Sequence, residues 1–413
     1  MSPNKCKHEQ IQLDTSPHAL TIPFQRPPHP KRLAAATPSG RVPQSLHPSE
    51  QTLAQTFPGP LVLPDDALTL DPKEPPQSLR SWIRSDQRNP LTPDRQTIYV
   101  APFPTISSSL SHLEEQTVPT TTTATTTADR LLKPPQTEDV ISYLKAFYHP
   151  LPVHPLPTTP SFEPWNKSSK SKSKYIGLKI GNNTVTRIRT RPCPDQVFQG
   201  GQLNLDDILD AALEALPGDA YALVMLVGQD LYEDEEDVFC CGRAYGQSRV
   251  AVVSCARYCP LLDGDGGGIS LNSSEHGWWP AAHCKAFVDS VCGDPGEGGV
   301  DREVAKGWPV GAAVDAVVGF EEEEEDMEGV WFARLARTVS HELGHCLCLD
   351  HCVYYACVMQ STAGVAEDLR QPPYLCPLGR GDAEVVVRER YLALRRFWYY
   401  AWLGRRLEVM DRE

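Results

Sequence analysis

The sequence lacks the features of a secreted or membrane-bound protein. Its first ten residues, Met-Ser-Pro-Asn-Lys-Cys-Lys-His-Glu-Gln, contain no apolar signal-peptide core, and no uninterrupted apolar stretch approaches the length needed to cross a bilayer. We therefore expect a soluble, cytoplasmic protein. In that compartment its 13 cysteines are expected to be thiols or metal ligands and not disulfides.

The chain also lacks an excess of positive charge. Its 39 Lys and Arg face 53 Asp and Glu, which gives a net charge of −14. This balance argues against a binder of nucleic acid or of a membrane surface, since both need a basic face. The acidic run 321–326 carries part of that charge. A basic cluster within 167–174 predicts a flexible loop, with a nuclear import signal as the alternative.

Regular hydrophobic periodicity is missing from the proline-rich start of the chain. Most of the 38 prolines lie in the first half, and residues 1–94 show no sustained period of 2 or 3.6. Such segments bury too little apolar area to offset the entropy of ordering. We expect residues 1–94 to be disordered and residues 95–410 to form one domain. Low-complexity inserts are predicted near 105–136, 160–174 and 260–329.

Within 95–410 the hydrophobic pattern predicts a mixed α/β domain. Strands are expected at 98–101, 175–180, 185–190, 222–227 and 250–254, and helices at 137–149, 205–216, 331–348 and 383–410. The continuous apolar run at 222–227 is typical of a buried central strand. Asn204 is placed to cap the helix that follows it. Residues 249–254 are expected at the sheet edge beside a cleft, where an extended peptide could pair with them.

The clearest chemical pattern is the run His-Glu-Leu-Gly-His-Cys-Leu-Cys-Leu-Asp-His, which starts at His341. His341 and His345 are four apart on the predicted helix, so their imidazoles project from one face and can bind one ion. His351 is six residues further on, so the chain must turn sharply after about residue 347. Three neutral imidazoles leave Zn²⁺ one open position, and Glu342 is placed to act as the general base.

Other interpretations of these patterns are weaker. Histidines on a helix can be ordinary core or surface residues, but the third histidine and the amphipathic helix both favour a metal site. A glycine-rich acidic run that begins at Asp263 lacks two calcium ligands and is predicted to be a loop. A further group fits no standard zinc spacing: His276, His283, Cys284 and Cys292.

The spacing of the three histidines is that of the metzincins, His-Glu-x-x-His-x-x-Gly-x-x-His. The run from His351 to Met359 matches the archaemetzincin signature, His-Cys-x4-Cys-x-Met. The chain therefore resembles the archaemetzincin family over roughly 97–405, apart from the inserts. The resemblance implies a zincin-like metzincin fold, with a small mixed twisted sheet, an active-site helix and a C-terminal helix. It also implies a zinc metallopeptidase that hydrolyses peptide or protein substrates with zinc-bound water. We expect the protein to be a monomer.

The resemblance also implies a role for particular residues. The catalytic zinc would be bound by His341, His345 and His351, with Glu342 as general base and Met359 in a Met-turn. A second, structural zinc site would include Cys352, Cys357 and Cys376.

Two positions depart from the family pattern. Cys348 stands where the family has the turn glycine, and Gly379 stands where it has the last cysteine of the second site. A left-handed turn at Cys348 would cost about 1 kcal/mol. Cys348 could replace the missing fourth ligand, or the second site has been lost and its cysteines are buried thiols.

These departures leave other functions open. A zinc-bound but inactive peptide-binding or scaffold protein would tolerate both changes, but it would not need Glu342. A redox or zinc-storage protein built on the cysteines would explain neither Glu342 nor the amphipathic helix.

Overall fold

The structure is a computed structural model that describes residues 18–42, 59–60, 62–116, 132–165, 174–181, 184–263, 327–369, 371–373 and 375–376. The chain divides into two compact units. Unit 1 contains the described parts of 1–85 and 350–381, and unit 2 contains those of 86–267 and 327–349. The predicted helix at 383–410 and the group between His276 and Cys292 lie outside the described residues.

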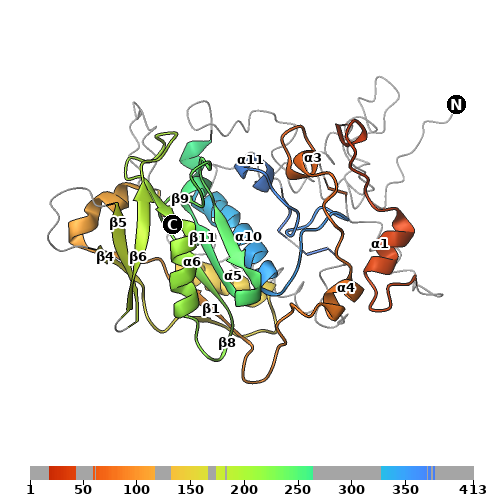
Figure 1. The fold of residues 1–413 in the computed structure, drawn as a ribbon, viewed down its shortest axis with the longest axis horizontal. Helices are drawn as coiled ribbons and strands as arrows, with labels where there is room; N and C mark the ends of the chain where they lie inside the picture. Colours follow the sequence, from red (N-terminus) through yellow and green to blue (C-terminus); the bar gives the residue numbers. More distant parts are fainter. Residues whose placement is uncertain are drawn as a thin grey trace, which may run out of the picture. The chain divides into compact units, whose positions relative to one another are not determined.

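A five-stranded sheet forms the centre of unit 2 (Figure 1). Its order is β10 (Gly242–Tyr245), β11 (Val250–Ser254), β8 (Ala220–Val227), β1 (Thr97–Ala101) and β3 (Val153–Pro155). All neighbours are parallel except β10, which pairs antiparallel with β11. Every residue of β8 is buried, so the prediction of a buried central strand at 222–227 is confirmed.

The prediction that residues 249–254 form an edge strand is wrong. β11 lies between β10 and β8, and all five of its residues are buried, which is typical of a strand with neighbours on both sides. The edge on this side of the sheet is the short, partly exposed β10.

A second sheet of six strands lies beside the first in unit 2. Its order is β2 (Thr105–Ile106), β4 (Ser161–Pro164), β5 (Tyr175–Ile180), β6 (Thr184–Arg191), β7 (Gln202–Asn204) and β9 (Leu231–Tyr232). β5 and β6 are the strands predicted at 175–180 and 185–190, and they pair antiparallel. β2 and β4 lie within the stretches near 105–136 and 160–174 where inserts were predicted. Phe162 of β4 is fully buried, and this packing adds the segment to the fold.

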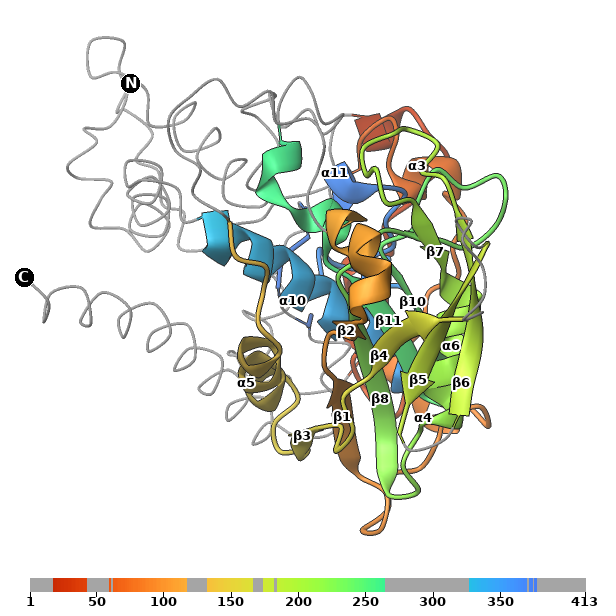
Figure 2. The ribbon, with the colours of Figure 1, turned by 90° about the vertical axis from the view of Figure 1, so that its left-hand side faces the viewer.

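Helices cover both faces of the central sheet (Figure 2). α6 (Leu205–Glu214) and the second sheet lie on one face, joined by a buried apolar cluster that includes Ile208, Leu178 and Met225. The neighbours of Met225 on β8 point to the opposite face, against which α10 (Met327–Cys346) packs together with α5 (Thr137–Phe147). The side chain of Asn204 accepts the Asp207 N–H at 3.1 Å, which confirms the predicted cap of α6.

The long helix α10 forms because apolar residues recur at every fourth position. Four residues of this apolar stripe are buried, namely Trp331, Leu335, Val339 and Leu343, and Leu347, also predicted to belong to it, is half-buried. The Trp331 indole N–H donates to the Cys255 carbonyl, 2.7 Å away, just after β11. Further along, the chain after β10 approaches the end of the helix so closely that a Cβ at Gly246 would lie 2.6 Å from the His345 carbonyl oxygen. These contacts bring the end of α10 beside the edge strand.

The prediction that residues 1–94 are disordered does not hold for 18–42, 59–60 and 62–94, which the structure describes. Unit 1 contains those up to Ser85. Its described helices are α1 (His29–Ala35), α3 (Ala67–Leu70), α4 (Leu79–Arg84) and α11 (Val365–Asp368). Leu68 and Leu79 are buried. Arg26 donates to the Tyr354 carbonyl at 2.8 Å. The proline-rich segments therefore order by packing on a distant stretch of chain, which local composition does not reveal.

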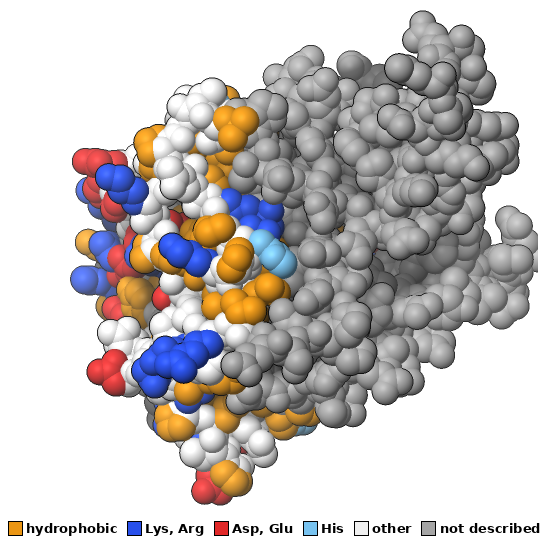
Figure 3. All heavy atoms as spheres, turned by 90° about the vertical axis from the view of Figure 1, so that its right-hand side faces the viewer, with side chains coloured by type: hydrophobic (Ala, Val, Ile, Leu, Met, Phe, Trp, Pro, Cys, Tyr) orange, Lys and Arg blue, Asp and Glu red, His pale blue; other side chains and the backbone are white. Residues whose placement is uncertain are grey.

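Two general properties of the described surface bear on function. None of the described helices is both long and apolar enough to span a membrane. On the face in Figure 3, lysine and arginine side chains lie among hydrophobic ones, and acidic side chains stand mainly near the left margin. The net charge of −14 is therefore not expressed as a continuous acidic surface on the described part of this face.

Candidate metal centre

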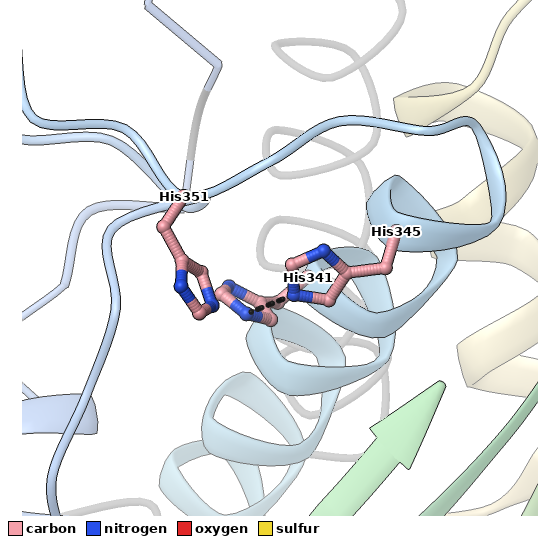
Figure 4. A group of neighbouring side chains, drawn as sticks. All are labelled: His341, His345 and His351. Atoms are coloured by element: carbon pink, nitrogen blue, oxygen red, sulfur yellow. Dashed lines mark hydrogen bonds between the residues drawn. The ribbon is translucent and has the colours of Figure 1, made fainter. Parts of the chain in front are cut away.

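The three histidines expected to bind zinc lie together. Ring nitrogens of His341, His345 and His351 are within 4.8 Å of one another, and in Figure 4 the His351 ring points toward the other two. The Nε2 atoms of His341 and His345 are 3.0 Å apart. Two nitrogens bound tetrahedrally to zinc at about 2.0–2.1 Å would be roughly 3.3 Å apart. The donor set therefore fits a zinc ion.

The turn after His345 is a Schellman motif, a common way for a helix to end. The Leu349 N–H donates to the Gly344 carbonyl at 3.0 Å, and the Cys348 N–H donates to the His345 carbonyl at 2.8 Å. Cys348 has a φ of 62°, so the turn does take the left-handed conformation at this position. The turn also orients a ligand, because Nδ1 of His345 lies 2.7 Å from the Leu349 carbonyl oxygen. Nδ1 must donate there, which leaves the Nε2 lone pair for a metal.

Replacing Cys348 with glycine is expected to stabilise the folded protein. Glycine adopts a positive φ without the steric penalty of a Cβ, so the gain should be up to about 1 kcal/mol in the free energy of unfolding. Chemical denaturation of metal-free protein measures it. Cys346→Gly is the matched control, since Cys346 is buried within the helix and its loss should destabilise. A lower stability for Cys348→Gly would contradict the argument.

Glu342 is buried on α10, on the side that faces the edge strand. Burial raises the pKa of the Cys240 thiol to about 12, and the charge of Glu342 contributes to the same rise. Cys240 stands two residues before β10. The carboxylate of Glu342 therefore lies near the start of the edge strand.

Three of the predicted second-site ligands also lie together. Sulfur atoms of Cys352, Cys357 and Cys376 are within 4.8 Å of one another, and all three residues are buried. Hydrogen bonds from Cys357 and Cys376 hold the pKa of the Cys352 thiol well below its usual value. Burial raises the pKa of the thiols of Cys357 and Cys376. A bound cation would favour the thiolate form of all three residues.

The remaining predicted residues of this region are placed as follows. Met359 is buried, and its carbonyl accepts the Cys352 N–H at 2.7 Å, which closes the loop between them. Its role in a Met-turn stays a prediction. Cys348 is not one of these three clustered thiols, and its role as a fourth ligand stays a prediction. Gly379 lies outside the described residues.

Sequence reasoning missed two features of the site. Glu74 lies with Oε1 2.6 Å from Nδ1 of His351, and nothing in the run Lys-Glu-Pro-Pro marks it. The edge strand β10 was missed because a four-residue strand that begins with glycine carries little pattern. The aromatic Tyr245 at its end was the available signal.

This chain is similar to known proteins, and the family match falls on the region of the metal centre. The family model for Peptidase family M54 matches residues 312–378, the segment that contains both metal groups. Archaemetzincin-2 of Macaca fascicularis is 23% identical over 345 residues, covering 82% of this chain and 74% of that protein. Human archaemetzincin-1 is 25% identical over 213 residues, covering 51% of this chain and 36% of that protein.

Two solved structures are also similar. The archaemetzincin of Methanopyrus kandleri has a TM-score of 0.32 and 16% identity, covering 74% of this chain and 97% of that one. The archaemetzincin of Archaeoglobus fulgidus, complexed with malonate, has a TM-score of 0.30 and 16% identity, covering 68% and 95%.

Proposed function

Because this chain belongs to the archaemetzincin family, we propose that it is a zinc-dependent metallopeptidase with a metzincin-like active site. The observation that carries the proposal is the group of three imidazoles with a buried glutamate next to the first of them. Its substrates would be peptides or proteins.

In this proposal His341, His345 and His351 bind one zinc ion through their Nε2 atoms. Nδ1 of His345 is engaged by the Leu349 carbonyl and Nδ1 of His351 by a carboxylate, so both rings present Nε2 to the ion. Zinc at this position supplies Lewis-acid chemistry, lowering the pKa of water toward ~7 and polarising the carbonyl to be attacked.

Glu342 carries the proton transfers. Its carboxylate takes the proton from the attacking water and gives it to the nitrogen of the leaving amine. Its burial beside Cys240 supports this role, since a carboxylate that only served solubility would be exposed. A protein that merely bound zinc and peptide would not need a base here.

The edge strand β10 is the proposed docking strand for an extended substrate. The Ser254 N–H donates to the Cys241 carbonyl at 2.8 Å, and hydrogen-bonded pairs alternate along an antiparallel ladder. The backbone N–H and C=O groups of Arg243 and Tyr245 therefore point toward β11 and hydrogen-bond with it. Gly242 and Ala244 direct their backbone groups to the open side, where a peptide can add as a further strand.

Replacing Ala244 with proline should weaken peptide turnover without disturbing the metal. The change removes one outward N–H, worth about 0.5–1.5 kcal/mol, so kcat/KM should fall roughly two- to twelvefold. Steady-state kinetics and zinc analysis measure the two effects. The matched control is Arg243→Pro, which removes an N–H directed at β11 and should destabilise the sheet. Unchanged kcat/KM in Ala244→Pro would remove β10 from the substrate site.

We further propose that Cys352, Cys357 and Cys376 hold a second zinc ion. Their clustering and burial support it, although a closed structural site takes four ligands. Metal analysis of the purified protein should find two zinc ions per chain, and Cys352→Ser should lower the count to one. Cys255→Ser, which changes a buried cysteine outside both groups, should leave the count unchanged. A single ion unaffected by Cys352→Ser would mean that these cysteines are only buried thiols.

Chelation tests the proposed activity as a whole. Purified protein should cleave members of a mixed peptide library, lose this activity with a chelator, and regain it when zinc is returned. Zinc-loaded protein that binds peptides from the library but cleaves none would instead be a binding or scaffold protein.

A further inference from the structure

A carboxylate from the proline-rich N-terminal region reaches one of the three histidines. Oε1 of Glu74 lies 2.6 Å from Nδ1 of His351, and Oε2 accepts the hydroxyl of Ser361 at 2.7 Å. We propose that Glu74 is a positioning residue for the metal ligand His351. This inference rests on the proposed function, since it takes the three histidines as zinc ligands.

The same segment also holds in place Asp350, the residue directly before His351. Gln77 Nε2 donates to the Asp350 carboxylate at 2.9 Å, and the Asp350 N–H donates to Gln77 Oε1 at 3.1 Å. Glu74 and Gln77 therefore fix two successive residues, Asp350 by a pair of hydrogen bonds and His351 through its ring. Both contacts lie within unit 1.

The segment that carries Glu74 is itself anchored. Glu367 accepts the Ala67 N–H and the Ala363 N–H through one carboxylate oxygen, each at 2.8 Å. Asp66 accepts the Leu63 N–H at 2.8 Å. The Glu74 side chain is 17% exposed and that of His351 34% exposed, so this pair is more shielded than a surface ion pair. Glu74 is therefore presented to His351 by ordered chain.

The chemistry follows from the two nitrogens of an imidazole. A carboxylate at Nδ1 keeps the proton on that atom, which leaves the lone pair on Nε2, fixes the plane of the ring and makes Nε2 a stronger donor to the metal. His345 has a backbone carbonyl in the corresponding position. The carboxylate at His351 adds a negative charge, which compensates part of the charge of a zinc ion bound by neutral ligands.

The test compares zinc affinity among variants of the full chain. His351→Ala should lose one zinc ion. Glu74→Ala should bind that same ion about 10- to 100-fold more weakly, as measured by competition with a chromophoric chelator. Glu74→Gln should lose less, because its amide oxygen can still accept the Nδ1–H. The matched control is Asp71→Ala, a carboxylate of the same segment that accepts only the nearby Lys73 N–H among the contacts described.

Two further measurements separate positioning from a general structural role. The visible spectrum of Co²⁺-loaded protein should change in Glu74→Ala and not in Asp71→Ala, because ligand geometry changes. The melting temperature of the metal-free protein should fall less than that of the zinc-loaded protein. If Glu74→Ala does not fold, Ser361→Ala and Glu74→Gln carry the same comparison.

Three outcomes decide the matter. If Glu74→Ala keeps its zinc affinity and its Co²⁺ spectrum while His351→Ala loses zinc, only the positioning role of Glu74 is overturned. Equal loss of stability with and without metal, at unchanged affinity, would make Glu74 purely structural. Unchanged affinity in His351→Ala would overturn the proposed zinc site itself.

Discussion

Glu342→Gln protein is expected to keep its zinc and to lose peptide hydrolysis. The amide has nearly the same size and shape as the carboxylate, but it cannot accept the proton of the attacking water. General-base catalysis contributes about 10²- to 10⁴-fold to the rate, so kcat should fall by about 100-fold or more. Zinc analysis and turnover of the best peptide from a library measure the two properties on the same preparation.

The control for this experiment makes the same change on the same helix. Glu328 lies in the first turn of α10, where its carboxylate accepts the Lys133 N–H at 3.2 Å. Glu328→Gln should keep both zinc and activity. Undiminished hydrolysis by zinc-containing Glu342→Gln protein would refute the mechanism, although zinc binding by the histidines would stand.

His341→Ala protein is expected to lose the metal together with the activity. Two imidazoles remain, and a catalytic zinc site takes three protein ligands. The zinc content should fall by one ion per chain, and hydrolysis should fall to background. Addition of zinc should no longer raise the melting temperature through this site, because stabilisation by a ligand depends on its affinity for the folded state.

The matched control is an exposed histidine elsewhere in unit 2. His154 lies in β3 at the far edge of the central sheet, and its side chain is exposed. His154→Ala should keep the zinc content and activity of the unchanged protein. Full zinc content in His341→Ala would place the ion elsewhere and remove the basis of the proposed active site.

The central elements of unit 2 were predictable because their signals are local. The continuous apolar run of β8 and the apolar stripe at every fourth residue of α10 are local sequence patterns, and they predict which residues are buried. The pairing of His341 with His345 follows from the pitch of a helix. The sharp turn after about residue 347 followed from the spacing of His351, whereas its left-handed conformation at Cys348 is a finding of the structure.

Non-local pairing could not be read in the same way. The apolar sequence of β11 fits an edge strand as well as an interior one. β11 is an interior strand only because β10 pairs antiparallel with it. The same holds for the order of residues 62–94, whose composition alone favours disorder.

By itself, the sequence determined the chemistry: the histidines, the glutamate and the cysteines, and the helix that carries the first two histidines. Local spacing encodes these, since a helix repeats every 3.6 residues. Only the tertiary structure decided what surrounds them, namely β10 at the edge of the sheet and Glu74 at His351. Glu74 and His351 are 277 positions apart. A contact over that separation exists only once the chain has folded, because packing brings the two segments together.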